Sequence, residues 1–480
     1  MEALQTDKQK EYPSEAKMNG PLENASLHFE RAAERLGSAS FKREYGLKYA
    51  YLSGAMYRGI ASKELVVSMG KAGLLGFLGT GGLSLDRIRS DIESIQKELS
   101  QGQAYGMNLI CDVSDPSMEM KTVEVYLEKG IQRIEASAFM QITPALVYYR
   151  LKGLEKKPNG TLECRHKILA KVSRPEVAKA FMSPAPERIV TKLLSQNKIT
   201  PEQAQWAESM PMANDICVEA DSGGHTDQGV ATVLLPAIQS LRKEMGMDER
   251  NLRIGLAGGI GTPQAVAAAF AMGADFVLTG SINQCTVESG MSSAVKDLLQ
   301  DINVQDTAYA PAGDMFEMGS KIQVLKKGLF FPARANRLFM LYSHYNALEE
   351  IPETIRKQLE DKYFKKSFET IWQETKTYLE GRGKTEEIEK AQRHPKYKMA
   401  LVFRWYFGYS IRLAFSGDDK NQVDYQVHTG PALGAFNQWV KGTEWESWRA
   451  RHVDQIAYKL MKDAAILLVG RLQELMETEL

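Results

Sequence analysis

The residues with the clearest capacity for chemistry lie near the middle of the chain. An apolar run over residues 215–220 ends in a polar, glycine-rich turn, residues 221–224, which is followed by His225. The strands of α/β barrels present catalytic groups at the barrel mouth in this way. An imidazole there can act as a general acid or base, or as a hydrogen-bond donor. Lone histidines are usually structural, but the strand-end position favours a site residue here, and we assign no role to the other six histidines.

Two later runs also end in glycine-rich turns. The run over 253–259 ends in Gly258 and Gly259, and the run over 276–281 ends in Thr279, Gly280 and Ser281. Glycine lets the backbone approach an anion closely, and the N–H groups that open a following helix favour negative charge. These two neighbouring turns therefore predict a phosphate site.

Two polar side chains within apolar runs have alternative interpretations. Lys171 emerges from an otherwise apolar strand, so it needs either an anionic ligand or a salt bridge across the barrel, for which Glu219 is the candidate. Asn108 carries an amide that donates and accepts at once, as recognition of a flat heterocycle requires, although Asn also caps loops. Both alternatives remain open for each residue.

Small residues end the first apolar run. Ser53, Gly54 and Ala55, followed by Met56, leave room for a planar ring against the backbone, but small residues serve packing equally well. Gly79–Gly82 superficially resembles a phosphate loop but lacks the Walker lysine, so it predicts a tight turn near the barrel mouth.

The spacing of apolar segments predicts the fold class. Helical patterns alternate with the apolar runs, which implies parallel strands joined by right-handed crossovers. Eight runs within about 240 residues favour a TIM (β/α)8 barrel over the alternative, a Rossmann-like doubly wound sheet. The runs cover residues 50–56, 74–81, 105–110, 132–137, 167–172, 215–220, 253–259 and 276–281, and the helical patterns include 60–72, 85–99, 122–129, 175–181 and 263–272.

The pattern changes after Ser281. Long helical stretches over 349–379, 385–393 and 452–480 predict a mostly helical C-terminal accessory domain. The aromatic segment Leu401–Tyr409 favours a buried helix face, with a channel for a long apolar substrate as the alternative. We therefore expect a disordered leader over 1–24, a barrel with a helical lead-in over 25–300, and the accessory domain over 301–480.

Composition bounds the class of protein. The chain has 480 residues, 44% of them hydrophobic and 25% charged, with 60 basic and 60 acidic residues. This balance gives no argument for nucleic acid or an anionic membrane. The four cysteines lack C-x-x-C spacing, so we expect reduced thiols and no metal site. The N-terminus lacks an apolar signal core and the apolar run over 464–470 is too short to span a bilayer, so we expect a cytoplasmic protein.

With these residues placed, the chain resembles the nitronate monooxygenase and enoyl reductase superfamily of flavoproteins. It is most similar to the PfaD branch, the trans-acting enoyl reductases of bacterial polyketide and polyunsaturated fatty acid synthases. The resemblance runs through most of the chain, and its motifs together are highly specific. They are Tyr51–Met56, Gly106–Leu109, Ala170–Arg174, Glu219–Asp227, Ala257–Gly261 and Thr279–Ser281.

The resemblance implies an FMN-binding barrel and a role for each motif. The phosphate would lie against Gly258, Gly259, Gly280 and Ser281. The isoalloxazine ring would face Gly54–Met56, and Ser222–Gly224 would line the ribityl-phosphate region. Asn108 and Lys171 would lie at the pyrimidine edge, where a cation stabilises the reduced ring. His225 corresponds to the family histidine near the substrate, as a base in nitronate monooxygenases and as a carbonyl polariser or proton donor in enoyl reductases. Ser53, Glu219 and Thr279 complete the cofactor site expected from these motifs.

The resemblance also implies NADPH as reductant and an enoyl thioester on an acyl carrier protein as substrate. The segment 321–337, which mixes basic and aromatic residues, could dock an acidic carrier, although ordinary surface charge accounts for it more simply. Two alternatives remain: a nitronate monooxygenase, and a non-catalytic docking subunit of a synthase complex. A homodimer is possible.

Overall fold

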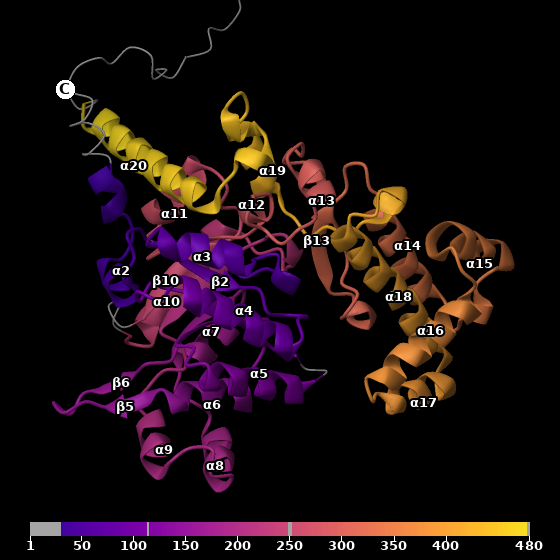
Figure 1. The fold of residues 1–480 in the computed structure, drawn as a ribbon, viewed down its shortest axis with the longest axis horizontal. Helices are drawn as coiled ribbons and strands as arrows, with labels where there is room; N and C mark the ends of the chain where they lie inside the picture. Colours follow the sequence, from indigo (N-terminus) through magenta and orange to yellow (C-terminus); the bar gives the residue numbers. More distant parts are fainter. Residues whose placement is uncertain (1–29, 113–114, 248–251, 478–480) are drawn as a thin grey trace, which may run out of the picture.

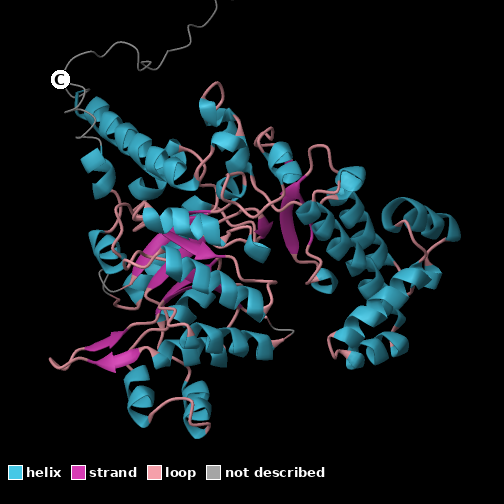
Figure 2. Cartoon of the chain, in the orientation of Figure 1, coloured by secondary structure: helices cyan, strands magenta, loops and turns pink. Residues whose placement is uncertain are grey.

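The protein is built around a closed eight-stranded parallel barrel (Figures 1 and 2). The structure, a computed structural model, describes residues 30–112, 115–247 and 252–477, so the leader expected over 1–24 lies outside the described residues. Around the barrel the strands follow the order β1-β11-β10-β8-β7-β4-β3-β2. All eight predicted runs are barrel strands, and closure excludes the open doubly wound sheet. The strands are β1 (Tyr51–Ser53), β2 (Leu75–Leu78), β3 (Gly106–Ile110), β4 (Arg133–Ser137), β7 (Lys167–Val172), β8 (Asp215–Glu219), β10 (Arg253–Ala257) and β11 (Val277–Thr279).

Helices connect the barrel strands and cover the outside of the barrel. Capping residues set where they begin, because a side-chain oxygen there satisfies a free N–H of the first turn. The helix predicted over 60–72 begins after Ser62, which accepts from Leu65 N, and the one predicted over 122–129 begins earlier, after Asp115, which accepts from Met118 N. The helices are α3 (Lys63–Lys71), α4 (Leu85–Glu98), α5 (Pro116–Glu128), α6 (Pro144–Lys152), α7 (Pro175–Met182), α10 (Ala231–Glu244) and α11 (Pro263–Ala271).

Smaller elements decorate this frame. The hairpin β5 (Leu154–Lys156) and β6 (Leu162–Cys164), with α8 (Glu187–Ser195) and α9 (Pro201–Ala207), lies on the outside of the barrel, where α8 and α9 pack against α6 (Figure 1). The short helix α12 (Ser281–Gln284) follows β11 directly, and α13 (Ser293–Leu299) comes next.

A second, three-stranded sheet joins the barrel to the C-terminal region. It has the order β12-β13-β9, formed by β12 (Thr307–Pro311), β13 (Lys321–Leu325) and the two-residue strand β9 (Gly224–His225). Both pairings are antiparallel, and Ile322 lies opposite His225. The sheet therefore fixes the backbone that carries the histidine singled out by the sequence.

A helical insertion follows this sheet and lies to one side of the barrel (Figure 1). Its core is aromatic: Phe316 and Phe403 are fully buried and Phe407 is 2% exposed. The aromatic segment 401–409 lies within α18, so the interpretation as a buried helix face is confirmed. The long helix pattern over 349–379 is interrupted, because Lys365 adopts a left-handed conformation and Ser367 caps a new helix. The helices are α14 (Phe331–His344), α15 (Glu353–Leu359), α16 (Phe368–Gly381), α17 (Thr385–Arg393) and α18 (Pro395–Ser416).

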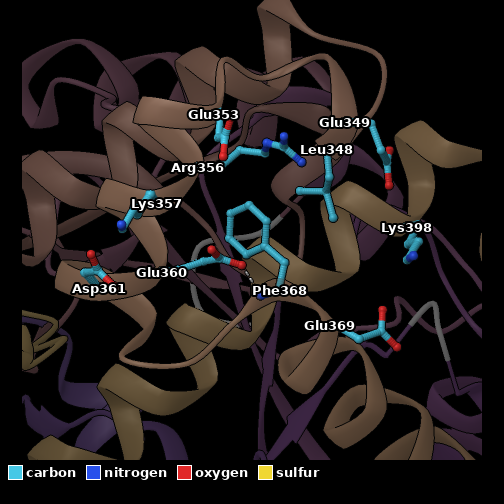
Figure 3. Close-up of a pocket in the computed structure, with 10 residues that line it drawn as sticks. All are labelled: Leu348, Glu349, Glu353, Arg356, Lys357, Glu360, Asp361, Phe368, Glu369 and Lys398. Atoms are coloured by element: carbon cyan, nitrogen blue, oxygen red, sulfur yellow. Dashed lines mark hydrogen bonds between the residues drawn. The ribbon is translucent and has the colours of Figure 1, made fainter.

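A pocket of about 510 Å³ lies within this insertion (Figure 3). Five acidic and three basic side chains line it, and Glu360 accepts a hydrogen bond from Phe368 N at 2.6 Å, which supports the start of α16. No residue of the predicted site lines this pocket.

The chain then returns to the barrel. Helix α19 (Pro431–Trp439) and the long helix α20 (Val453–Glu477) contribute buried residues to the same core cluster as the barrel helices. Tyr458 donates to Ala72 O at 2.6 Å, which ties α20 to the end of α3. The domain boundary predicted near residue 300 stays a prediction. The buried residues that form the core of the helical insertion all lie between 310 and 407. Among the described residues, no helix combines the length and apolar character needed to cross a membrane.

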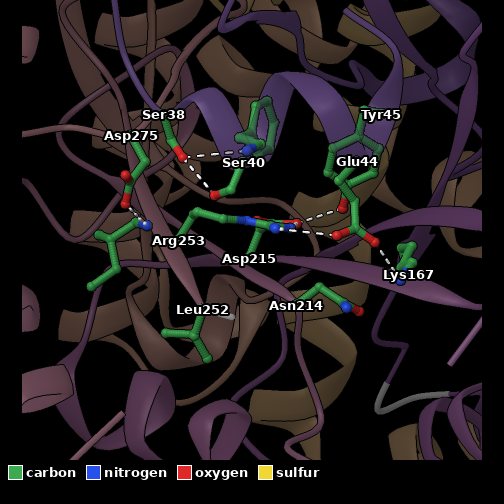
Figure 4. Close-up of polar contacts among 12 residues, drawn as sticks. Ser38, Ser40, Glu44, Tyr45, Lys167, Asn214, Asp215, Leu252, Arg253 and Asp275 are labelled. Carbon is green, nitrogen blue, oxygen red and sulfur yellow. Dashed lines mark hydrogen bonds and ion pairs between the residues drawn. The ribbon is translucent and has the colours of Figure 1, made fainter. Parts of the chain in front are cut away.

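A buried ion pair closes the floor of the barrel (Figure 4). Asp215 and Arg253 open β8 and β10, and their side chains are 0% and 2% exposed. The guanidinium donates to both carboxylate oxygens, at 2.6 and 3.0 Å, and Tyr45 of helix α2 (Ala39–Tyr45) donates to the same carboxylate. A buried charge is tolerated when it is paired and hydrogen-bonded in this way.

We expect Tyr45→Phe to lower the free energy of unfolding by about 1–3 kcal/mol, because Asp215 loses a buried donor. Urea denaturation would measure the change. Tyr378→Phe, at a side chain that is 60% exposed, is the control and should stay close to the parent protein. Equal stabilities for Tyr45→Phe and the parent would contradict a structural role for this hydroxyl.

Candidate active site

The predicted site residues meet at the carboxyl ends of the barrel strands. Around the mouth they follow the order Asn108, Lys171, Glu219, Gly258, Gly280 and Gly54, on β3, β7, β8, β10, β11 and β1 or directly after them, with β4 between β3 and β7. This is the edge of the barrel where such folds place their active sites. The structure therefore brings the predicted site residues together at the barrel mouth. That each of them contacts a ligand stays a prediction.

Lys171 lies between two carboxylates inside the barrel. Its Nζ is 2.8 Å from Glu219 Oε1 and 3.4 Å from Glu135 Oε1, and its side chain is 13% exposed. Burial alone lowers the pKa of Lys171, but the two carboxylates outweigh it and raise the pKa above its ordinary value. The salt bridge with Glu219 that the sequence suggested is confirmed, and it leaves Lys171 positively charged.

Glu135 is the partner that sequence analysis missed. Its side chain is fully buried, and its Oε2 accepts from Ala55 N at 2.8 Å. Burial raises the pKa of this carboxyl, although Lys171 opposes the shift. The sequence did contain an indication of this residue, because Glu135 is a carboxylate inside the apolar run 132–137. The alternation of side chains along a strand directs it into the barrel. Glu135 thereby connects Lys171 to the backbone that follows β1.

Asn108 is positioned from the neighbouring strand. Its Nδ2 donates to Glu135 O at 3.0 Å and to Ser137 Oγ at 2.9 Å, and the residue is 6% exposed. Its backbone carbonyl accepts from Thr80 and Tyr126. Both amide hydrogens therefore serve the barrel wall, which orients the side chain.

The end of β1 is held by a buried polar network. Asn283 Nδ2 donates to Ser53 Oγ and to Thr279 Oγ1, both at 2.9 Å. Ser53 and Thr279 are both buried, with at most 1% of either residue exposed. An added Cβ at Gly54 would lie 2.5 Å from Leu278 Cδ2, so a side chain at this position would require Leu278 to shift. Ser53 and Thr279 therefore position the strand ends, and the half-buried Ala55 and Met56 follow at the mouth.

Glycines end β10 and β11, and two of them, Gly259 and Gly280, border open space, whereas a Cβ added at Gly258 would lie 2.5 Å from Ala220 O. Gly258 and Gly259 have φ angles of +87° and +74°, which favour glycine, and Cβ atoms added at Gly259 and Gly280 would meet nothing within 4 Å. Gly280 also precedes Ser281, the first residue of α12. Two adjacent strand ends thus form a glycine cradle whose backbone borders open space at Gly259 and Gly280, which suits a phosphate group.

His225 lies in β9, beyond the barrel strands, and pairs with Asp314. Its Nε2 is 2.9 Å from Asp314 Oδ1, and the two side chains are 50% and 64% exposed. Burial lowers the pKa of His225, but the hydrogen bond and charge of Asp314, aided by Glu219, outweigh it and raise the pKa. The imidazole is therefore accessible and retains its proton to higher pH than an isolated histidine.

The turn before His225 is packed against the chain that follows the insertion. A Cβ added at Gly223 would lie 2.6 Å from Thr429 Cα, and one added at Gly224, whose φ is +87°, would lie 3.4 Å from His428 Nδ1. Ser222 and Gly223 are half-buried. The two glycines thus let residues 428–429 pass close to the histidine.

Asp314 and His428 are further residues that sequence analysis missed. Burial lowers the pKa of His428 to about 4, and the charge of His225 adds to the effect, so His428 is neutral at neutral pH. Both residues lie more than 85 positions after His225 along the chain. The sequence contained only a weak indication of Asp314, an acidic residue that comes after Pro311, Ala312 and Gly313, where a strand ends.

The turn over Gly79–Gly82 is a tight turn at the mouth, as predicted. Leu83 N donates to Thr80 O at 3.0 Å, and a Cβ at Gly79 would lie 1.7 Å from Met56 O. This glycine lets the β2 and β1 loops touch.

Comparison with known proteins places this barrel in a family. Residues 42–315 match the family model for nitronate monooxygenase, and residues 345–425 match the model for the inserted helical domain of acyl-carrier-protein S-malonyltransferase. The first match covers more than half of the chain. The chain therefore belongs to the nitronate monooxygenase family, which consists of flavin-dependent barrel enzymes.

Individual proteins are similar to this chain over more of its length than the family model is. The polyketide biosynthesis protein PksE of Bacillus subtilis is 57% identical over 92% of this chain, and ThaF of Burkholderia thailandensis is 53% identical over 91%. This chain spans 58% of PksE and 38% of ThaF. The crystal structure of the enoyl reductase domain of MlnA, from the macrolactin cluster of Bacillus amyloliquefaciens, is 46% identical and superposes with a TM-score of 0.88. That match covers 92% of this chain and 99% of the MlnA domain.

Proposed function

We propose that this protein is an FMN-dependent enoyl reductase. It uses NADPH to reduce the α,β double bond of an enoyl thioester carried on an acyl carrier protein, in the biosynthesis of a polyketide or polyunsaturated fatty acid. The observation that carries the proposal is the match to the MlnA enoyl reductase domain, because it extends through the barrel and the helical insertion together. A family match restricted to the barrel would not separate the possible reactions.

The residues at the mouth fit a flavin mononucleotide. The backbone around Gly258, Gly259, Gly280 and Ser281 would hold its phosphate, since added side-chain atoms at Gly259 and Gly280 would meet open space. Asn108 and Lys171 would lie at the polar edge of its ring, and Gly54–Met56 against its face. When bound, FMN would carry a hydride equivalent from NADPH to the β carbon of the thioester. The protein itself would orient the substrate, exclude water and supply a proton through His225.

Filling the cradle should weaken cofactor binding while preserving the fold. We expect Gly280→Leu to weaken FMN binding by at least about tenfold, because a side chain would occupy space needed by the phosphate. Fluorescence titration of the apoprotein with FMN would measure the affinity, and circular dichroism would check the fold. Gly470→Leu, at another glycine whose added Cβ meets nothing within 4 Å, should bind FMN normally. Unchanged affinity in Gly280→Leu would contradict the phosphate assignment.

The helical insertion supports a carrier-bound substrate. Its match to an inserted domain of an acyl-carrier-protein transferase points to carrier-linked chemistry. In the segment 321–337, Lys326, Lys327 and Phe330 are exposed. Arg334 instead pairs with the buried Asp424, so it serves the fold. A carrier-docking surface here would therefore rest on these two lysines and on Lys321, which is also exposed.

One experiment separates the proposal from its alternatives. The protein is reconstituted with FMN, reduced anaerobically with NADPH, and mixed with a crotonyl thioester of pantetheine. Bleaching by NADPH followed by reoxidation by the thioester is the expected result. Turnover of a nitronate with oxygen but without NADPH would favour a nitronate monooxygenase, the activity named by the barrel's family model. Failure to bind FMN at all would favour a non-catalytic docking subunit.

A further inference from the structure

We propose that Asp314 is a positioning residue for His225, which holds the imidazole in one orientation and one tautomer for proton delivery to the substrate. This inference deepens the proposed function and rests on it. It assigns a role to the loop between β12 and β13, which neither the sequence motifs nor the barrel alone would indicate.

The backbone fixes both partners of this pair. His225 is held by the pairing of β9 with β13, and Thr226 N donates to Lys321 O at 3.2 Å just beyond it. On the other side, the loop that carries Asp314 is closed by Ala312 N donating to Ser320 O at 2.8 Å. The contact at 2.9 Å therefore joins two segments of one small sheet.

The helical insertion anchors the same loop on both sides of Asp314. A Cβ added at Gly313 would lie 2.6 Å from Phe407 Cβ, so the backbone there packs directly on α18. Phe316 is fully buried, and its ring lies 5.5 Å from that of Phe407 and 5.6 Å from that of Phe339. The carboxylate is thus presented to the histidine by the aromatic core of the insertion.

Three titratable groups face His225, each from a different element. Asp314 comes from the loop after β12, Glu219 from the end of β8, and His428 from the chain before α19. His428 is held neutral by its burial and by its neighbour. Burial raises the pKa of Asp314, but the bond with His225 outweighs it and keeps the carboxyl ionised. The net charge around His225 therefore favours the protonated imidazole. The effect is moderated by solvent, because the side chains of His225 and Asp314 are both exposed.

This geometry assigns separate tasks to the two ring nitrogens. Nε2 bonds Asp314, whereas Nδ1 makes no hydrogen bond within the described part of the chain. The carboxylate keeps a proton on Nε2, so the mobile proton resides on Nδ1. A hydride from NADPH, which bound FMN would carry, would form the new C–H bond at the β carbon, and the α carbon would then take the Nδ1 proton. A C–H bond forms, the N–H electron pair stays on the ring, and the neutral Nε2–H tautomer remains on Asp314.

The test compares Asp314→Asn with the parent holoenzyme through two readouts. One is the histidine ring titration by NMR with labelled histidine, with the signal of His225 assigned from its loss in His225→Ala. The other is the pH profile of flavin reoxidation by the crotonyl thioester. We expect the His225 pKa to fall in Asp314→Asn. The donor is the protonated ring, so the rate of reoxidation falls as the pH rises through the pKa of His225. In Asp314→Asn this fall should begin at a lower pH than in the parent, and reoxidation should be about tenfold slower at neutral pH.

Two further variants sharpen the result. Glu317→Gln is the matched control, since this acid lies in the same loop but pairs with Arg404 at 3.3 Å, and it should match the parent in both readouts. Gly313→Ala should behave like Asp314→Asn, because the methyl group must displace the loop from Phe407. Flavin reduction by NADPH should stay unchanged in every variant.

The outcomes distinguish this inference from the proposed function. If the parent protein is not reoxidised by the thioester, the proposed function fails, while the NMR titration still reports on Asp314. If the His225 pKa is the same in Asp314→Asn and the parent, the positioning role is overturned whatever the activity. Equal slowing of flavin reduction and reoxidation in Asp314→Asn would also overturn it, because that pattern indicates general damage to the site.

Discussion

Replacing Lys171 by Met is expected to lower the free energy of unfolding by about 3 kcal/mol, since removing one partner of a buried ion pair strands the other. The stranded group is Glu135, whose side chain is fully buried and whose nearest cation is Lys171 at 3.4 Å. Urea denaturation of the apoprotein measures this effect without reference to catalysis. In the holoenzyme, we also expect flavin reduction by NADPH to slow by about 10²-fold, as on loss of one preorganised stabilising group.

Two comparisons test the cause of the instability. Combining Lys171→Met with Glu135→Gln should restore most of the lost stability, because the buried charge is removed, but it should not restore flavin reduction. Lys198→Met breaks a more exposed pair, with Glu124 at 3.0 Å, and should cost at most about 1 kcal/mol. A loss in Lys171→Met no larger than that in Lys198→Met would show that the barrel tolerates an unpaired Glu135.

His225→Ala is expected to slow flavin reoxidation by the enoyl thioester by about 10²- to 10⁴-fold, the usual contribution of a general acid. Reduction of the flavin by NADPH and the FMN content should stay near the parent values, because His225 lies in β9, outside the glycine cradle. Anaerobic stopped-flow absorbance resolves the two half-reactions.

The control for this variant is His344→Ala, at an exposed histidine in the helical insertion. It should match the parent in both half-reactions. Reoxidation of His225→Ala at the parent rate would remove the imidazole from the chemistry, and a water molecule would then be the proton donor.

The barrel was predictable because its signals are local. Each strand is a short apolar run, and residues such as Ser62 and Thr262 cap the helices that follow. The glycines at 258, 259 and 280 could be identified for the same reason, since a glycine at a strand end usually serves backbone geometry or the close approach of a ligand. The salt bridge of Lys171 with Glu219 followed from the cost of a lone buried charge.

The rest of the site depends on contacts between distant parts of the chain. The sequence did not indicate Asp314 and His428 as neighbours of His225, because the second sheet that brings them together is formed by β9, two residues long, and by strands about 80 to 100 positions later. Glu135 was missed because a carboxylate in a strand can face solvent as well as the interior. Gly223 suggested a ligand, but the structure shows the backbone of Thr429 beside it.

The way the helical insertion joins the barrel has a practical consequence. Its incoming and outgoing chains run side by side: Leu325 N donates to Val427 O at 2.9 Å, Phe330 N donates to Val423 O at 2.6 Å, and Val324 bridges His428. The module that they enclose thus begins and ends at one joint. Chimaeras that exchange residues 331–422 with those of a relative need not lengthen or shorten any barrel connection, so the contribution of the insertion can be tested by exchanging it as one unit.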